Sequence, residues 1–324
     1  MVCHPFHKTA CKTSGFVRQN ATECAFATSD SWVILTPIEQ SIKRKIEAVG
    51  TPLKDWDIQI NYGIKTGCNE AFIIDEAKRA ELIAADPKSA EIIRPILRGR
   101  DIKRYGYNYA GLYLIATFPA RHYDIEQYPA VKHYLLSFDK ERLLEAGIDD
   151  IANNAALLTD FCRQRLEQSG KDIIINGHKV IIDGKAQKAR KKTGNKWFET
   201  QDQIGYWEDF NQQLIVYNDI AQRLTFAMTS AGTFTNNTVY FIKGEEKTLC
   251  YLLAYLNSNL IDWYYRTLSV QLGTKAVRMF SIYMEKLPIP LFEMGKNAPH
   301  NETEIFESYG LNEEEIKYLL KKTS

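Results

Sequence analysis

Two stretches of the sequence concentrate basic side chains of the kind that bind phosphate groups. Residues 94–105, "RPILRGRDIKRY", hold five basic residues and one acidic residue. Residues 161–200 hold ten basic residues and four acidic ones, although the formal net charge of the whole chain is only +1. Because tyrosine and tryptophan residues lie between these basic residues, the pattern indicates a surface for a nucleic-acid backbone as readily as a merely solvated charged face.

The first stretch offers cations at short spacing. Its candidates could neutralise phosphates or present a bidentate guanidinium to guanine, and the alternative is pairing with Asp101 and other acids within the chain. These candidates are Arg98, Arg100, Lys103 and Arg104.

The loop over residues 185–196 is the strongest electrostatic candidate. A flexible cationic segment can follow a DNA backbone or enter a groove and become ordered on contact. A surface loop without a ligand is the alternative. Trp197 and Phe198 are expected to anchor this loop in the core. Its cations are Lys185, Lys188, Arg190, Lys191, Lys192 and Lys196.

A third candidate is the stretch "NYGIKTGCNEAFIID", residues 61–75. Gly63 and Gly67 permit a tight turn whose amides could approach a phosphate or a base edge, and a plain connection between strands is the alternative. The side chains that would join those amides are Lys65, Thr66 and Asn69.

Two groups of residues could bind a metal. Asp172 and the run Asp183-Gly184-Lys185 resemble the carboxylates and lysine of many DNA nucleases. They flank the hairpin "DIIINGHKVIID", in which Asn176-Gly177 predicts a two-residue turn. That turn places Ile175 opposite His178 and leaves Asp183 beyond the strand end, which favours solvated carboxylates over a nuclease site.

The second group lies near the N-terminus, where the spacings match no common zinc site. We therefore expect ordinary unligated side chains there and no metal site in the chain. The residues are Cys3, His4, His7, Cys11 and Cys24.

The spacing of glycine and proline excludes several classes of enzyme. No two of the 18 glycines are separated by a single residue, which excludes the dinucleotide fingerprint and the usual glycine loop of an S-adenosylmethionine site. No two prolines are adjacent, so the Asn-Pro-Pro-aromatic motif that grips a flipped adenine is absent. The motifs GxxxxGK[ST], HExxH, CxxC and GxSxG are absent as well.

The hydrophobic periodicity predicts the elements that hold these candidates. The sequence "TPIEQSIKRKIEAVG" predicts an amphipathic helix with Thr36 as its cap, Pro37 as its first residue and Gly50 after its end. Further helices are predicted around residues 76–86, over 89–97, from 129 to 147 and over 248–268. Strands are predicted over residues 56–64, 67–75, 111–118, 213–220, 223–230 and 237–244. The long helix over 248–268 is expected to bury Tyr251, Leu252, Leu256, Leu260, Trp263 and Tyr264.

Helices and strands grouped in this way predict an α+β fold with mixed, mostly antiparallel twisted sheets and packed helices. We expect a loosely ordered lead-in over residues 1–30, a main domain over 31–295 and an acidic helical segment over 296–324. The six cysteines are sparse, and no apolar run approaches the roughly 20 residues of a membrane helix. We therefore expect a cytoplasmic protein without a membrane partner.

Five pieces of the sequence, in order, resemble the specificity domain that follows the methyltransferase core in TaqI-like and type IIG restriction-modification enzymes. They are "NYGIKTGCNEAFIID", "IIRPILRGRDIKRY", "KWFETQ", "LLAYLNSNLIDWYY" and "EKLPIPLF". The resemblance spans roughly residues 32–292, and the "LNS" helix, the "LGTKAVR" loop and the closing "LPIP" are also similar to type I specificity subunits.

This resemblance implies a target-recognition domain that reads a short sequence in double-stranded DNA for an adenine-specific methyltransferase. It adds Asn236, Asn237, Lys275 and Arg278, on later loops, to the candidate DNA contacts. The chain lacks the catalytic core, so we expect S-adenosylmethionine and Mg²⁺ only on a methyltransferase or nuclease core, on the same polypeptide or a separate subunit. The alternatives are the metal-dependent nuclease above and a protein-interaction module that docks on a methyltransferase through its acidic C-terminal helix. Cations distant in sequence, such as Arg100, Lys191 and Lys275, are expected to converge on one concave face.

Overall fold

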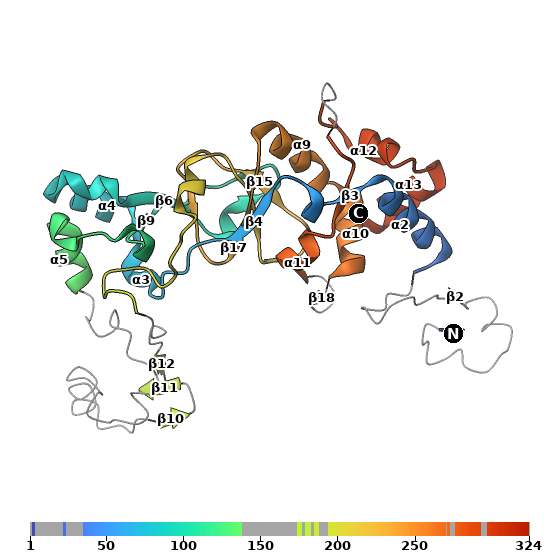
Figure 1. Cartoon of the computed structure of the whole chain (residues 1–324). Helices are drawn as coiled ribbons and strands as arrows, with labels where there is room; N and C mark the ends of the chain where they lie inside the picture. The colour runs from blue at the N-terminus through green and yellow to red at the C-terminus, as the bar shows by residue number, and fades with distance from the viewer. Residues whose placement is uncertain are drawn as a thin grey trace.

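The computed structural model describes residues 35–137, 194–269, 276–292 and 297–323, together with the backbone of short strands outside these ranges. The elements lie in a row (Figure 1). Helices α4 (Glu76–Ala85) and α5 (Pro129–Ser137) are at one end, and α2 (Pro37–Val49), α12 (Glu302–Ser308) and α13 (Glu313–Thr323) are at the other. A four-stranded sheet lies between them.

The central sheet is antiparallel, and its two faces contact different cores. Its strand order is β15 (Phe226–Met228), β13 (Ile215–Asn218), β17 (Val239–Lys243) and β4 (Gln59–Tyr62). Successive side chains of a strand point to opposite faces. Ile215 and Ile242 therefore enter one hydrophobic cluster, whereas Val216 and Phe241 enter the other.

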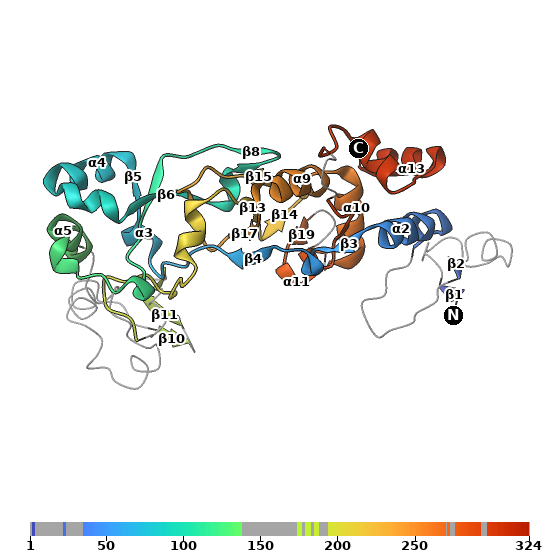
Figure 2. The same ribbon diagram turned by 45° about the horizontal axis from the view of Figure 1, so that its top comes forward.

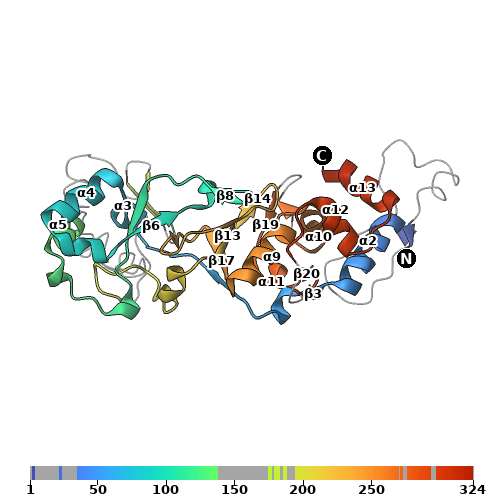
Figure 3. The same cartoon turned by 90° about the horizontal axis from the view of Figure 1, so that it is seen from above.

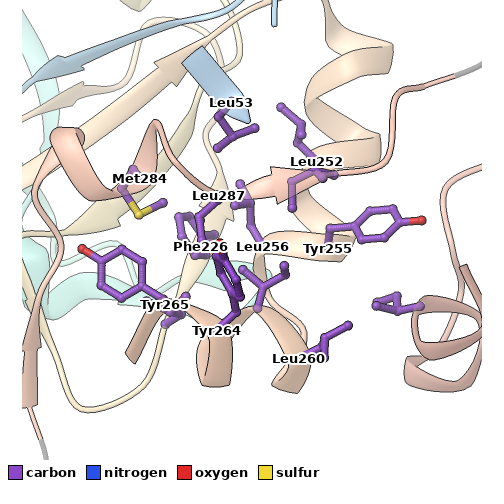
Figure 4. Packing of buried hydrophobic residues seen from close by; sticks show 14 of the residues in the cluster. Leu53, Phe226, Leu252, Tyr255, Leu256, Leu260, Tyr264, Tyr265, Met284 and Leu287 are labelled. Carbon is purple, nitrogen blue, oxygen red and sulfur yellow. The ribbon is translucent and has the colours of Figure 1, made fainter. Parts of the chain in front are cut away.

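The first core is helical. It is enclosed by α2, α9 (Glu246–Leu256), α10 (Asn259–Leu268), α11 (Ser281–Met284), α12 and α13, and by the strand pair β3 (Thr51–Pro52) and β20 (Pro288–Ile289). Figure 4 shows part of this packing, in which side chains from α9, α10 and α11 surround Phe226 of the central sheet. Ile305 and Leu319 of α12 and α13 belong to the same buried cluster.

The second core lies between the central sheet and a mixed sheet of order β16 (Phe234–Thr235), β6 (Ile93–Leu97), β9 (Leu112–Ile115) and β5 (Ile73–Asp75). Strand β16 runs parallel to β6, and the other pairs are antiparallel. Helices α3 (Asn69–Phe72), α4 and α5 contribute apolar side chains to this core.

Smaller sheets complete the described structure. Strands β7 (Ile102–Lys103) and β8 (Gly106–Tyr107) form a hairpin that packs on β15. Strand β19 (Ala276–Arg278) pairs with β14 (Ile220–Ala221) and β18 (Gln271–Leu272). Strands β10 (Ile174–Asn176), β11 (Lys179–Ile182) and β12 (Lys185–Gln187) form one sheet, and β1 (Val2–Cys3) pairs with β2 (Thr22–Glu23).

The predicted fold class is confirmed: the protein is α+β, with sheets that are mostly antiparallel. The first helix is confirmed in detail, because α2 begins at Pro37 and Thr36 and Glu39 form a capping box. The strands predicted around β4, β9, β13, β15 and β17 and the helix α4 are confirmed as well. The six residues expected to be buried over residues 248–268 are all in the first core.

Three predicted elements are wrong. Residues 67–75 are not one strand, because Asn69–Phe72 form the short helix α3 before strand β5. The helix predicted over residues 89–97 is the 3-10 helix η2 (Pro87–Glu91) followed by strand β6, in which Pro95 and the β-branched Ile93 and Ile96 disfavour a helix.

The third wrong element is the long helix over 248–268, which is two helices. Helix α9 ends at Leu256, and Ser258 caps α10 by accepting a hydrogen bond from the Ile261 amide. Ser, like Asn, competes with the helical backbone for hydrogen bonds, so it favours caps over helix interiors.

The hairpin of β10 and β11 is confirmed, but its predicted register is wrong by two residues. Asn176 pairs with Lys179, so Gly177 and His178, rather than Asn176 and Gly177, separate the strands. Lys185 starts strand β12, so the cationic segment predicted as a loop begins with a strand. Asp172 and Asp183 lie outside the described residues, as do the side chains of the N-terminal Cys and His group.

Within the described part of the chain, no helix is both long enough and apolar enough to cross a membrane.

Candidate nucleic-acid interface

Three segments that are distant in the sequence meet at Asn236. The Asn236 amide donates to the Leu97 carbonyl at 3.0 Å, and the Ile64 amide donates to the Thr235 carbonyl at 2.7 Å. Ile64 and Asn236 form a parallel bridge next to the parallel pair of β16 and β6. Residues 63–65, 97–100 and 235–238 therefore lie side by side, and we call them the Asn236 junction.

Two glycines permit this close approach. A Cβ atom on Gly63 would lie 2.2 Å from the Asn236 carbonyl oxygen, and one on Gly99 would lie 2.8 Å from Asn218 Oδ1. The Gly99 amide donates to Thr238 Oγ1 at 3.1 Å, and that hydroxyl donates to Asn236 Oδ1 at 2.7 Å. Gly63 thus serves chain packing, whereas Gly67, with φ of +80°, serves the turn that the sequence predicts.

Lys65 is the last residue of the first junction segment and is exposed. Its carbonyl oxygen accepts hydrogen bonds from the amides of Gln201 at 3.2 Å and Asp202 at 3.3 Å. This contact holds the segment that carries the exposed Lys196 beside the turn. The fold therefore places the backbone of Lys65 against a segment that begins a few residues after Lys196 in the sequence.

Thr66 and Asn69 are not equivalent. Thr66 is buried and its hydroxyl donates to Asn69 Oδ1 at 2.7 Å, whereas Asn69 is exposed at the start of α3. The hydroxyl of Thr66 therefore already has a partner inside the protein, and Asn69 keeps its amide group available to solvent.

Arg98 makes a bidentate ion pair with Asp101. Its Nε and Nη2 atoms lie 3.0 and 2.9 Å from the two carboxylate oxygens. Burial opposes the charge of Asp101, but hydrogen bonds from Arg98 outweigh it and hold the pKa of that carboxyl below its usual value. The same hydrogen bond raises the pKa of Arg98. Arg98 is therefore paired within the chain, which was the alternative to DNA contact, while Arg100 is exposed.

Arg104 is also paired. Its Nη2 atom lies 2.5 Å from the Asn257 carbonyl oxygen and 3.1 Å from Glu302 Oε1. Lys103, which precedes it, is exposed, and its ammonium donates to the Arg100 carbonyl at 3.3 Å. The contribution of these residues to DNA binding stays a prediction.

Asn236 and Arg278 are linked through residue 219. The Asp219 amide donates to the Thr238 carbonyl at 3.1 Å, and the Met279 amide donates to the Asp219 carbonyl at 2.8 Å. Arg278 thus lies close in space to the junction, with its guanidinium 5.4 Å from the ring centre of Phe280. The side chain of Asn236 is buried and fixes the local backbone, whereas its neighbour Asn237 is exposed.

The remaining candidates lie outside the described residues, so the predicted convergence of Arg100, Lys191 and Lys275 stays a prediction. The structure likewise leaves the proposed nuclease residues untested. Among the residues that it describes, no three His, Cys, Asp or Glu side chains are grouped to hold a metal ion. The undescribed candidates are Lys188, Arg190, Lys191, Lys192 and Lys275.

The structure has a pocket of about 540 Å³ next to Lys65 that the sequence did not indicate. Tyr62 and Tyr206 form one wall, with the Tyr206 hydroxyl donating to the Tyr62 carbonyl at 2.9 Å. Asn195 and Gln203 line the pocket and are hydrogen-bonded to each other at 2.9 Å. Asn195 Nδ2 also donates to the carbonyls of Thr200 and Gln201 at 3.0 and 2.8 Å, so Asn195 is used within the protein, whereas the exposed Gln203 has an amide of the kind that can pair with adenine edges. The exposure of Tyr62 on strand β4 became visible only in the structure, so the sequence carried no signal for this place.

A family model described as the TaqI-like C-terminal specificity domain matches residues 94–289. The curated proteins include no significant match.

Two solved structures are similar at low identity. One is the type IIG restriction endonuclease BpuSI, at 12% identity and a TM-score of 0.45, with 85% of this chain and 28% of that one covered. The other is the type IIL restriction-modification enzyme MmeI in complex with DNA, at 13% identity and a TM-score of 0.41, with 71% and 24% covered. The chain thus spans about a quarter of the length of these enzymes.

The family match includes most of strand β6, two of the three segments of the Asn236 junction (residues 97–100 and 235–238), the helix pair α9 and α10, and strand β20. It covers more than half of the chain, which therefore belongs to the family of TaqI-like C-terminal specificity domains of restriction-modification enzymes.

Proposed function

We propose that this protein binds double-stranded DNA and selects a short target sequence for a restriction-modification system. The family match over residues 94–289 carries this proposal. The positions of Lys65 and Arg100 in the Asn236 junction, and the link of Arg278 to that junction through Asp219, support it, because they bring near one another the segments that carry cations distant in sequence, and several phosphate contacts need several cations.

Target selection is assigned to polar side chains beside these cations. Phosphate contacts set position and affinity, whereas hydrogen bonds to base edges set sequence preference. The exposed Asn69, Asn237 and Gln203 are suited to base edges, because side-chain amides can donate to or accept from a base.

Catalysis is assigned to another part of the system. A methyltransferase or nuclease core, on the same polypeptide or a separate subunit, would bind S-adenosylmethionine and Mg²⁺. Calorimetric titration of the chain alone with S-adenosylmethionine should therefore give no binding heat, and saturable heat would contradict this assignment.

Fluorescence anisotropy with a random duplex library tests the main proposal. Binding should weaken with salt, with a log-log slope of about −0.9 for each phosphate neutralised. Sequencing of the bound fraction should show enrichment of one short site. A duplex affinity that does not change with salt, or a bound fraction in which no sequence is enriched, would count against DNA target recognition.

Single substitutions sharpen this experiment. Arg100→Ala and Lys196→Ala should each reduce the magnitude of the salt slope by roughly 0.9 and weaken binding to all sequences alike. Lys132→Ala is the control, because Lys132 on α5 pairs with Glu126 at 2.6 Å.

A further inference from the structure

Tyr105 has two unusual properties at once. It lies in the turn between β7 and β8 with φ of +65°, a left-handed conformation that residues with a Cβ atom rarely adopt. Its side chain is also 53% exposed, which is high for a large aromatic residue. Glycine would adopt this backbone without strain, so the local backbone does not explain the presence of tyrosine.

The turn is held rigidly against the rest of the protein. The Tyr105 amide donates to the Phe226 carbonyl at 2.8 Å, and that oxygen also accepts a hydrogen bond from Asn257 Nδ2 at 3.0 Å. The preceding Arg104 contacts the Asn257 carbonyl and Glu302. Glu302 in turn accepts from the Asn259 amide at 3.0 Å. The hairpin tip is thus fixed to β15, to the junction of α9 and α10, and to α12. Figure 2 shows β8 near β15.

The surroundings of Tyr105 are positive. Lys103 of β7 and Arg100 of the preceding 3-10 helix (Gly99–Asp101) are exposed, while Asp101 and Glu302 are paired with Arg98 and Arg104. The guanidinium of Arg104 lies 5.3 Å from the centre of the Tyr105 ring. DNA is a polyanion whose interior consists of stacked aromatic bases. A rigid, exposed aromatic ring near cations is suited to contact such a molecule.

We propose that Tyr105 is a wedge that stacks on a base, or enters a base step, of the double-stranded DNA that the protein binds. Proteins that insert a side chain between bases use a rigid apolar group, and contacts to the adjacent phosphates offset the loss of base stacking. Lys103 and Arg100 would supply those phosphate contacts. This inference rests on the proposed DNA binding, but it concerns a residue and a mode of contact that binding alone does not require.

Substitutions at Tyr105 separate the ring from the backbone. Tyr105→Gly removes the ring and relieves the positive φ, so the folded protein should be at least as stable as the wild type. It should nevertheless bind the duplex enriched from the random library about 5- to 150-fold more weakly, the range for loss of one stacked base. Tyr105→Phe keeps the ring and should bind within about 3-fold of the wild type. Tyr109→Ala is the matched control, because Tyr109 is an exposed tyrosine that donates to the Leu112 carbonyl beyond the hairpin.

A fluorescent base gives a second readout. With 2-aminopurine placed at each adenine of the enriched duplex in turn, the wild type and Tyr105→Phe should change the emission at one step. Tyr105→Gly should leave the emission there as in free DNA.

Equal affinity of wild type and Tyr105→Gly for that duplex would overturn the wedge while leaving DNA recognition intact. Absence of any salt-dependent duplex binding by the wild type would overturn both proposals. Weakened binding of Tyr105→Gly to a methyltransferase core, with unchanged DNA affinity, would assign the ring to a protein interface and would also overturn the wedge.

Discussion

At the residue scale, single atoms decide how closely the segments of the Asn236 junction can approach. The Asn236 carbonyl occupies the place where a Cβ atom at position 63 would lie, so this position requires glycine. Lys65 and Arg100 are the last residues of two segments of this junction, so its geometry sets the spacing of two candidate phosphate contacts.

Gly63→Ala should therefore lower the free energy of unfolding by about 1–3 kcal/mol, the usual effect of overpacking a well-packed site. Gly205→Ala is the control, since a Cβ at that position meets nothing within 4 Å. Urea unfolding followed by circular dichroism measures both variants. Equal stability of the two would show that the junction can relax around an added methyl group.

Asn257 is the polar residue on which several elements depend. It is 1% exposed, accepts from the Phe226 amide at 3.0 Å and donates to the carbonyls of Phe226 and Leu253 at 3.0 and 3.1 Å. It thus satisfies backbone groups of β15 and α9 that water does not reach.

Asn257→Ala should cost roughly 2–4 kcal/mol of stability, because it leaves buried donors and acceptors without partners. Asn237→Ala, at an exposed position, should change stability by less than about 0.5 kcal/mol. The midpoints of chemical denaturation compare the two variants. A small effect at Asn257 would mean that the backbone of β15 finds other partners.

At the element scale, two buried carboxylates join the first and last described helices. Glu39 of α2 accepts from the Tyr318 hydroxyl at 2.6 Å and from Lys322 at 3.0 Å, both on α13. Glu315 of α13 accepts in the same way from Ser41 at 2.8 Å and Lys45 at 2.7 Å of α2. Figure 3 shows the two helices at the same end of the molecule.

These contacts make the helix pair sensitive to acid. Burial opposes the charged form of Glu39 and Glu315, but hydrogen bonds to each carboxylate outweigh burial and lower both pKa values. A carboxyl whose pKa is lower in the folded state stabilises the fold above its unfolded pKa of about 4.3 and loses that contribution as pH falls.

Glu39→Gln combined with Glu315→Gln should therefore destabilise the protein at pH 7 by about 2–4 kcal/mol in total and flatten the dependence of stability on pH below about pH 4.5. Urea midpoints measured between pH 7 and pH 3 test this expectation. An unchanged acid dependence in the double variant would assign the acid response to other carboxylates.

At the scale of the whole molecule, one sheet couples two cores. Neighbouring residues of β17 illustrate this, because Ile242 packs in the helical core and Phe241 in the other. A rigid sheet with both faces buried transmits a loss of packing on one side to the other side. The candidate DNA contacts on residues 61–69 and on β19 are therefore fixed in position relative to one another by the same sheet.

Phe241→Ala should cost about 3–5 kcal/mol and Ile242→Ala about 2–5 kcal/mol, and each should shift a single unfolding transition. Near-ultraviolet and far-ultraviolet circular dichroism should give coincident curves for both variants. Two separate transitions, each moved by only one substitution, would instead show that the two cores unfold independently.

The sequence by itself determined the elements whose signals are local. Thr36, Pro37 and Glu39 specify the start of α2 within four residues, and alternating apolar residues specify β13, β15 and β17. The fold class and the family followed from such pieces taken in order. The hairpin of β10 and β11 was also recognised, but its register was not. The pairs Asn176-Gly177 and Gly177-His178 can each serve as the two residues between the strands, and the local sequence does not decide between them.

Only the tertiary structure decided which candidates are used inside the protein and which reach solvent. The sequence shows Arg98, Arg100 and Arg104 as equivalent cations, but the fold pairs Arg98 with Asp101 and Arg104 with Glu302 and leaves Arg100 exposed. It also placed the backbone of Lys65 against residues 201 and 202 and left Tyr105 exposed. The physical reason is that hydrogen bonds and burial depend on which distant segments meet, and no local pattern of residues encodes that meeting.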